Sequence, residues 1–291
     1  MLPLTPLLIR PKLREGLIAA CATSLVTLLL WIGIAYWRDP HYSPEFSAGL
    51  KDLAAKHGQE AQSLFDHALR AAPANPDLYL KICEDAQKAQ QWPTLTEYAR
   101  RGLQNCPNAP LVVRLVLMNG LVTGLTEAKP AGWQEETLKT AKQAYDLAPE
   151  EPEVQNLYAY NLTDLRGDPD SLKQAQTILT TALQNLSKQP ESDALLDLRA
   201  AMQDSYGWTR CKQGDYSAAI DASNQAISGI SSLDYSDKTA QDNTLKTIYY
   251  HLGVAQHGKG DIEAARSALQ RALSYDANYA DAKAELAALK K

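Results

Sequence analysis

Side chains that could carry catalysis or bind a metal are sparse in this sequence and lack the spacing that such chemistry needs. The histidines are His41, His57, His67, His251 and His257. No two of them lie four residues apart, the separation that places two histidines on one helical face around a zinc ion. The sequence also has no GxSxG motif for an activated serine and no glycine-rich phosphate loop. We therefore expect no enzymatic activity, no metal, no cofactor and no small-molecule substrate.

The cysteines also lack a metal-binding or redox spacing. None of the four forms a CxxC pair, and Cys21 lies within an apolar run. We interpret Cys83 as a small buried residue. A disulfide between Cys83 and Cys106 stays open, because sequence spacing alone cannot decide it.

Composition favours an all-α protein that does not bind nucleic acid. The formal net charge is −5, and no run of lysine or arginine forms a basic stripe. Only two phenylalanines and three methionines occur, whereas alanine, leucine and tyrosine are abundant. Alternating runs of β-branched residues, the usual signal of strands, are missing.

A unit of 34 residues is best seen from Lys246 to Tyr279. Counted from Lys246, Gly253, Ala265 and Ala272 occupy positions 8, 20 and 27, and Leu269 occupies position 24. Small residues at three fixed positions allow two antiparallel helices to approach closely. The pattern resembles the tetratricopeptide repeat (TPR), a family of helix-turn-helix units whose members bind other proteins.

The resemblance extends over roughly residues 42–279. Units with related spacing begin near Tyr42, Pro76, Pro110, Pro152, Ala200 and Lys246, with extra residues near 126–133, 188–193 and 234–243. We predict an all-α solenoid of about six repeats over residues 46–279. Residues 280–291 are expected to form a capping helix whose charged face closes the array.

An apolar segment precedes the repeats. Residues 16–37 contain no charged side chain. At about 1.5 Å per residue this segment would span roughly 33 Å as a helix, enough to cross the apolar part of a membrane. It ends in Tyr36 and Trp37, which suit a membrane interface, and lacks the small residues of a signal-peptide cleavage site. We predict a single transmembrane helix that contacts membrane lipid.

The flanks of this segment predict its orientation. Arg10, Lys12 and Arg14 lie in a short basic tail over residues 1–15, whereas Arg38 is the only lysine or arginine of the linker over residues 38–45. The positive-inside rule therefore places the N-terminus in the cytoplasm. The repeats would then lie on the far side of the membrane, in the periplasm or an equivalent compartment.

The resemblance also implies which residues line a partner-binding groove. In TPR arrays the inner groove is formed by fixed positions of the first helix of each repeat. Here these positions include Leu80, Glu84, Arg114, Met118, Asn156, Tyr160, Asp204, Trp208, Tyr250 and Val254. Tyr160, Trp208 and Tyr250 are aromatics with a polar tip, which suits them as interface anchors. The alternative is that these three rings pack between neighbouring helices.

The groove does not match one known binding mode of the family. Some TPR proteins clamp the C-terminal carboxylate of a chaperone with a set of lysine, arginine and asparagine side chains. This groove instead mixes Glu84, Asp164 and Asp204 with Asn156 and Arg114. We do not expect a chaperone-tail clamp.

Two functional hypotheses remain from the sequence. The first is a membrane-anchored TPR scaffold or assembly factor that binds a partner protein, within a membrane-associated complex, at the membrane surface. The second is a permanent structural subunit of a multi-protein membrane complex. A stripe of small residues in the apolar segment would let that helix pack closely against others. These residues are Gly16, Ala19, Ala20, Thr23 and Thr27.

Overall fold

A computed structural model describes residues 42–233 and 238–289, which form thirteen α-helices and no strand. The first helices of the successive pairs are α3 (Pro44–Ala54), α5 (Pro76–Lys88), α7 (Leu111–Ala128), α9 (Pro152–Leu165), α11 (Asp193–Lys212) and α13 (Lys238–Lys259). The second helices are α4 (Gly58–Ala71), α6 (Trp92–Asn105), α8 (Trp133–Leu147), α10 (Pro169–Leu186), α12 (Tyr216–Ser231) and α14 (Ile262–Tyr275). A single helix, α15 (Ala280–Ala288), follows the sixth pair. The all-α prediction is confirmed for this part of the chain.

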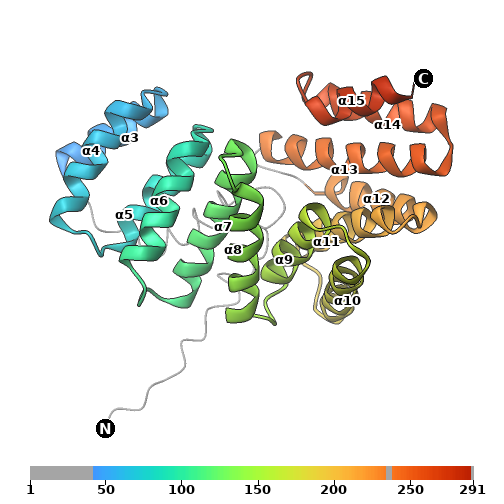
Figure 1. Cartoon of the computed structure of the whole chain (residues 1–291), viewed down its shortest axis with the longest axis horizontal. Coiled ribbons are helices and arrows are strands. Elements are labelled where there is room, and N and C mark those ends of the chain that lie inside the picture. The colour runs from blue at the N-terminus through green and yellow to red at the C-terminus, as the bar shows by residue number, and fades with distance from the viewer. Residues whose placement is uncertain (1–41, 234–237, 290–291) are drawn as a thin grey trace, which may run out of the picture.

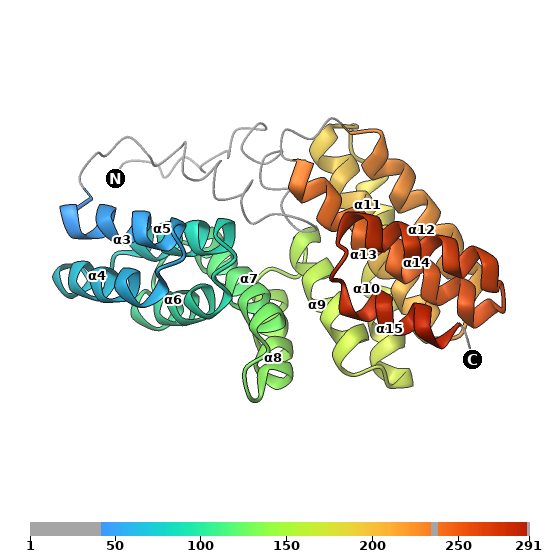
Figure 2. The same ribbon diagram turned by 90° about the horizontal axis from the view of Figure 1, so that it is seen from above.

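The helices stack in chain order into an extended array. Each helix packs mainly on its neighbours in the sequence, and the array runs from α3 and α4 at one end to α13, α14 and α15 at the other (Figure 1). In the N-terminal half, α3 and α5 lie along one side and α4 and α6 along the other (Figure 2). Packing between nearest neighbours along one axis is the property that defines a solenoid.

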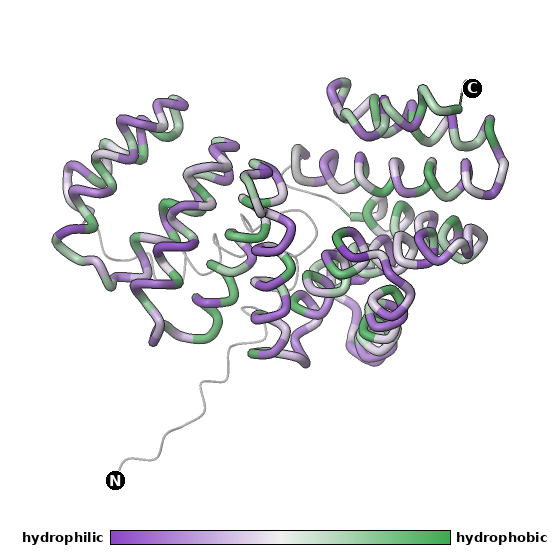
Figure 3. The backbone as a smooth tube through the Cα atoms, in the orientation of Figure 1, coloured by the Kyte–Doolittle hydropathy of each residue, from purple (hydrophilic) through white to green (hydrophobic). Residues whose placement is uncertain are grey.

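Small residues bring the two helices of each pair together. A Cβ atom added at Gly253 would lie 2.7 Å from Cγ of Leu269, closer than ordinary van der Waals contact allows. Ala265 and Ala272 on α14, the other small residues of this repeat, are fully buried. Most helices carry hydrophilic and hydrophobic stretches side by side (Figure 3), as expected when one face packs on a neighbour.

Helix starts follow local capping. The array begins at Pro44, inside the linker predicted over residues 38–45, because proline is well tolerated at the first position of a helix. The Ser43 hydroxyl caps this start by accepting a hydrogen bond from the Phe46 N–H at 3.2 Å. Asn75 and Asp168 cap α5 and α10 in the same way.

The extra residues predicted near 126–133 are divided between a helix and a loop. Residues 126–128 lengthen α7, and residues 129–132 form a loop in which Lys129 and Gly132 adopt left-handed backbone angles. Within residues 42–233 and 238–289, α7 alone is long and apolar enough to cross a membrane, with a mean hydropathy of 1.4. However, Val116, Leu117 and Leu125 of α7 are buried in the core, which makes it a central helix of the array.

The segments predicted as the basic tail (1–15) and the transmembrane helix (16–37) lie outside the described residues. Their predicted structure, and the orientation derived from it, therefore stay predictions.

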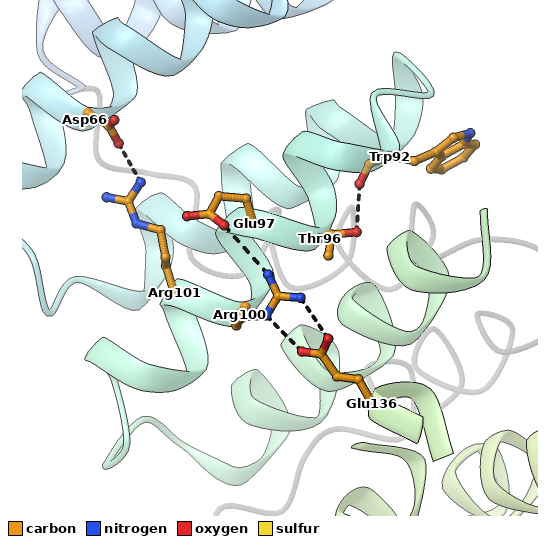
Figure 4. Close-up of polar contacts among 7 residues, drawn as sticks. All are labelled: Asp66, Trp92, Thr96, Glu97, Arg100, Arg101 and Glu136. Carbon is orange, nitrogen blue, oxygen red and sulfur yellow. Dashed lines mark hydrogen bonds and ion pairs between the residues drawn. The ribbon is translucent and has the colours of Figure 1, made fainter. Parts of the chain in front are cut away.

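Ion pairs link second helices of successive pairs. On α6, Arg100 binds both carboxylate oxygens of Glu136 on α8, with Nε–Oε1 and Nη2–Oε2 distances of 2.8 and 2.9 Å (Figure 4). The next residue, Arg101, reaches in the other direction to Asp66 on α4, at 2.5 Å. These side chains are partly exposed, so each pair contributes roughly 0–1 kcal/mol and acts mainly on the relative placement of the helices.

The three described cysteines are free and buried, so the Cys83–Cys106 disulfide that the sequence left open does not form. Burial raises the pKa of all three thiols, that of Cys211 to about 11. We expect Cys83 and Cys211 of the folded chain to react with iodoacetamide at about pH 8 at least about 100-fold more slowly than in the urea-unfolded chain, because the thiolate is the reactive form. Mass spectrometry of the labelled peptides measures each rate. Equal rates at Cys83 in the folded and unfolded chains would contradict its burial.

Candidate functional site

The ten residues predicted to line a groove all lie on first helices, two on each. Leu80 and Glu84 lie on α5, Arg114 and Met118 on α7, Asn156 and Tyr160 on α9, Asp204 and Trp208 on α11, and Tyr250 and Val254 on α13. In every pair the two residues are four positions apart and therefore share one face of their helix. The structure brings Tyr160, Trp208, Tyr250 and Val254 together, and Asp204 joins them through His251. Leu80, Glu84 and Met118 instead pack or pair elsewhere in the array.

On α5, the predicted groove residue Glu84 belongs to a network of charges within its own helix. Its carboxylate lies 2.5 Å from the Lys88 ammonium and 3.3 Å from that of Lys81, which also contacts Asp85 at 2.9 Å. Glu84 is buried, and a buried carboxylate needs such partners to offset the loss of water. On α7, Met118 is also buried, in a small core with Ala144 and Val154.

Five rings form what we call the aromatic cluster: Tyr160, Trp208, Tyr250, His251 and Tyr279. Trp208 stacks on His251 with 4.3 Å between ring centroids and lies 6.0 Å from Tyr250. Tyr250 in turn meets the edge of Tyr279 at 5.3 Å, and Tyr160 lies 6.2 Å from His251. Three consecutive first helices and the residue that precedes α15 therefore meet here, at aromatic spacings that add to the energy of burial.

The Trp208 side chain mainly contacts the neighbouring helices α9 and α13. Only 4% of its surface is exposed, and its indole N–H donates a hydrogen bond to Oδ1 of Asp164 on α9 at 3.2 Å. The Lys212 ammonium lies over the indole ring, 4.4 Å from its centroid. Tyr160, Tyr250 and Val254 are partly exposed. A partner that approaches this side would therefore meet the tyrosines and Asp164 more readily than the indole face.

His251 is a member of this site that the sequence reasoning missed. Its Nδ1 lies 2.9 and 3.0 Å from the two carboxylate oxygens of Asp204, and both side chains are more than nine-tenths buried. Asp204 and His251 are separated by 47 residues, so no local spacing rule connects them. The available signal was a polar ring directly after the predicted groove residue Tyr250. In residues 42–233 and 238–289 no group of three potential metal ligands occurs.

The electrostatic surroundings keep the tyrosines of the cluster protonated. Burial raises the pKa of Tyr160 well above its usual value, and the nearby carboxylates of Asp164 and Asp204 raise it further. Burial also raises the pKa of Tyr250 to about 12 and that of Tyr279 still higher, with Asp281 contributing to both. At neutral pH these phenols are therefore hydrogen-bond donors in a region of negative potential.

The comparisons with known proteins agree with the repeat at the end of the array. The family model of the tetratricopeptide repeat matches residues 247–279. A comparison with curated protein sequences finds no significant match.

Several solved structures resemble parts of the array at low sequence identity. The structure of MamA protein is 17% identical, covers 70% of this chain and 95% of its own, and superposes with a TM-score of 0.41. YrrB, described as a TPR protein with an unusual peptide-binding site, is 15% identical over 78% of this chain and 98% of its own, with a TM-score of 0.42. A tetratricopeptide repeat protein from Parabacteroides merdae ATCC 43184 is 14% identical over 85% of this chain and 99% of its own, with a TM-score of 0.47. At these scores we infer no partner from them.

The match at residues 247–279 coincides with α13, α14 and the turn after them, which is the sixth of six stacked helix pairs. Gly253, Ala265 and Ala272 form the close helix contact at the positions where this repeat requires small residues. Residues 247–279 therefore match a tetratricopeptide repeat in both sequence and helix packing.

Proposed function

We propose that this protein is a membrane-anchored scaffold or assembly factor, which binds a partner protein at the membrane surface through the first helices of its array. TPR proteins act as scaffolds for protein interactions. The observation that carries the proposal is the cluster on α9, α11 and α13, where partly exposed tyrosines and carboxylates stand together on successive first helices. Aromatic rings with polar tips are common anchors of protein interfaces.

The membrane part of the proposal rests on the uncharged segment at residues 16–37. A helix of that length suffices to cross a membrane and hold the array beside it. The basic tail supports a cytoplasmic N-terminus, with the array on the periplasmic or equivalent side. The alternative function, a permanent structural subunit of a membrane complex, differs in requiring specific contacts from this helix.

A photo-crosslinking experiment on the full-length chain in native membranes tests the scaffold function. A benzoylphenylalanine at Val254, partly exposed on α13, is expected to give discrete adducts with a partner protein. The same residue at Thr181, exposed on the second helix α10, serves as the control and is expected to give none. Equal adducts at both positions, or none at either, would contradict binding through the first helices.

Replacing residues 16–37 by an unrelated transmembrane helix separates the two functions. A scaffold that needs only an anchor is expected to keep its Val254 adducts, because the partner binds the array. A structural subunit would lose its assembly, seen as a shift of the complex on a native gel after mild-detergent extraction. Such a loss would refute the scaffold function and support that of a structural subunit.

A further inference from the structure

We propose that the aromatic cluster and the carboxylates beside it bind an arginine side chain of the partner protein. This inference rests on the proposed scaffold function and specifies the chemistry of the partner. It also distinguishes this array from a carboxylate clamp, whose ligand carries the opposite charge.

Charge is the first argument for a cationic ligand. The carboxylates of Asp164 and Asp204 border Tyr160, and those of Asp281 and Glu285 on α15 act on Tyr250. Two lysines also lie at the cluster, namely Lys212 over Trp208 and Lys246 over Tyr279. Lys246 already pairs with Asp276 at 3.6 Å. Asp204 and Glu285 already pair with His251 and His257, at 2.9 and 2.5 Å. Asp164 and Asp281 remain without a cationic partner among the described residues, so the cluster favours a further positive group.

Unused hydrogen-bonding groups are the second argument. Among the residues that the structure describes, Asn156 Oδ1 is buried and has no hydrogen-bond partner, although the side chain is only 6% exposed. Asn156 precedes Tyr160 by one turn of α9, and Asp164 follows Tyr160 by one turn, so the three share one face. An unmade hydrogen bond of this kind costs stability, commonly about 1–3 kcal/mol. The two acceptors lie eight residues apart on α9, about 12 Å along its axis, so one guanidinium can pair with the exposed Asp164 while the buried Asn156 oxygen calls for a separate N–H donor of the partner.

The aromatic rings are the third argument. Lys212 and Lys246 show that the faces of Trp208 and Tyr279 already attract cations, at 4.4 and 5.1 Å from the ring centroids. Lys212 is exposed, and the structure gives it no carboxylate partner in the described part of the chain. A bound cation can therefore displace the Lys212 ammonium without breaking an ion pair.

Arginine fits this combination better than lysine does. The guanidinium is planar, stacks on aromatic faces and carries five N–H donors in a fixed arrangement. It can form two parallel hydrogen bonds with the Asp164 carboxylate while its plane rests on a ring. A lysine ammonium offers only three donors around a point charge.

Titration of the full-length protein in detergent micelles tests the proposal. The probe is a nonapeptide of glycine and serine with one central arginine, and the readout is the indole N–H resonance of Trp208 in tryptophan-labelled protein. We expect a saturable shift of this resonance. Matched peptides with citrulline or glutamate at the centre are expected to bind at least about 10-fold more weakly, because they lack the positive charge. A response to citrulline as strong as that to arginine would overturn the proposal, as would the absence of a saturable shift.

Three substitutions locate the site. Asp164→Asn keeps an acceptor for the Trp208 indole but removes the negative charge. We expect it to lower the affinity for the arginine peptide by about 10-fold. Asp146→Asn on α8 removes an equal charge from an exposed carboxylate that pairs with Lys142, and should have no effect. Lys212→Ala should tighten binding by removing the competing cation. Equal losses from Asp164→Asn and Asp146→Asn would overturn the assignment of the site.

If the N-terminus instead lay on the same side of the membrane as the array, the chain's own basic tail would be the rival occupant. Replacing Arg10, Lys12 and Arg14 by glutamine in the full-length chain should leave the Trp208 resonance unchanged if a partner supplies the arginine. A shift of that resonance, without any response to the peptide, would overturn the proposal in favour of the tail. The Val254 crosslinks test the scaffold function separately from the arginine site. Adducts that persist in Asp164→Asn would refute the arginine site and still support the scaffold function.

Discussion

Replacing Phe65 with alanine is expected to lower the free energy of unfolding of the first helix pairs by about 3–5 kcal/mol, the usual cost of emptying an aromatic site in a core. Phe65 on α4 is fully buried. Its ring centroid lies 5.4 Å from that of Phe46 on α3 and 5.6 Å from that of Tyr98 on α6, where the contact is edge-on. One side chain therefore joins two successive helix pairs.

Hydrogen exchange provides the measurement, because a solenoid loses stability mainly near the site of damage. Amide protons of α3, α4 and α6 should exchange faster in Phe65→Ala, whereas those of α12 and α14 should keep their protection. Leu111→Ala is the control, since Leu111 is 45% exposed and its loss should cost no more than about 0.5 kcal/mol. A loss below about 1 kcal/mol at Phe65 would contradict its role in the core.

Gly124→Ala is the second change for which we expect a large effect, a loss of about 1–3 kcal/mol through overpacking. A Cβ atom at this position of α7 would lie 2.5 Å from Oγ1 of Thr96 and 2.9 Å from its backbone nitrogen on α6. The hydroxyl could rotate away, but the backbone could not, so α6 and α7 would have to separate.

Gly58→Ala is the matched control. It makes the same chemical change in α4, where the nearest atom to an added Cβ is 3.4 Å away and belongs to a side chain. Gly58 is the first residue of α4, where the gain from alanine is smaller than the roughly 1 kcal/mol of a helix interior, so this variant should be unchanged or slightly more stable. Thermal melts and urea unfolding of both variants decide the comparison. Equal stability of the two variants, or full rescue of Gly124→Ala by Thr96→Ala, would refute a backbone clash.

The sequence predicted the repeating part of the fold well because its signal is local. Small residues such as Gly253 and Ala265 recur at fixed positions, and their spacing alone implies two helices in close contact. The same reasoning placed the ten groove residues on first helices. It placed the start of the array two residues late, because Pro44 was interpreted as part of a linker although Ser43 caps a helix there.

The details of the site could not be predicted in this way. The contacts of Trp208 with Asp164 and of His251 with Asp204 join residues 44 and 47 positions apart. They depend on the rotation between one helix pair and the next. Many small packing contacts together determine that rotation, and no local spacing rule gives it. Tyr279 was treated as the end of a repeat, yet its ring completes the aromatic cluster. Residues 16–37 lie outside the described part, and the transmembrane helix stays a prediction.

The adjacent arginines of α6 have a mechanical consequence. Arg101 draws α6 toward α4 and Arg100 draws it toward α8, so both ion pairs act along the row of second helices (Figure 4). The first helices α3 and α5 run on the opposite side of this part of the array and pack through apolar contacts that salt does not screen. If the spacing of the second helices changes while that of the first helices stays fixed, the array must bend. We therefore expect ionic strength to change the curvature of this half of the molecule more than its stability.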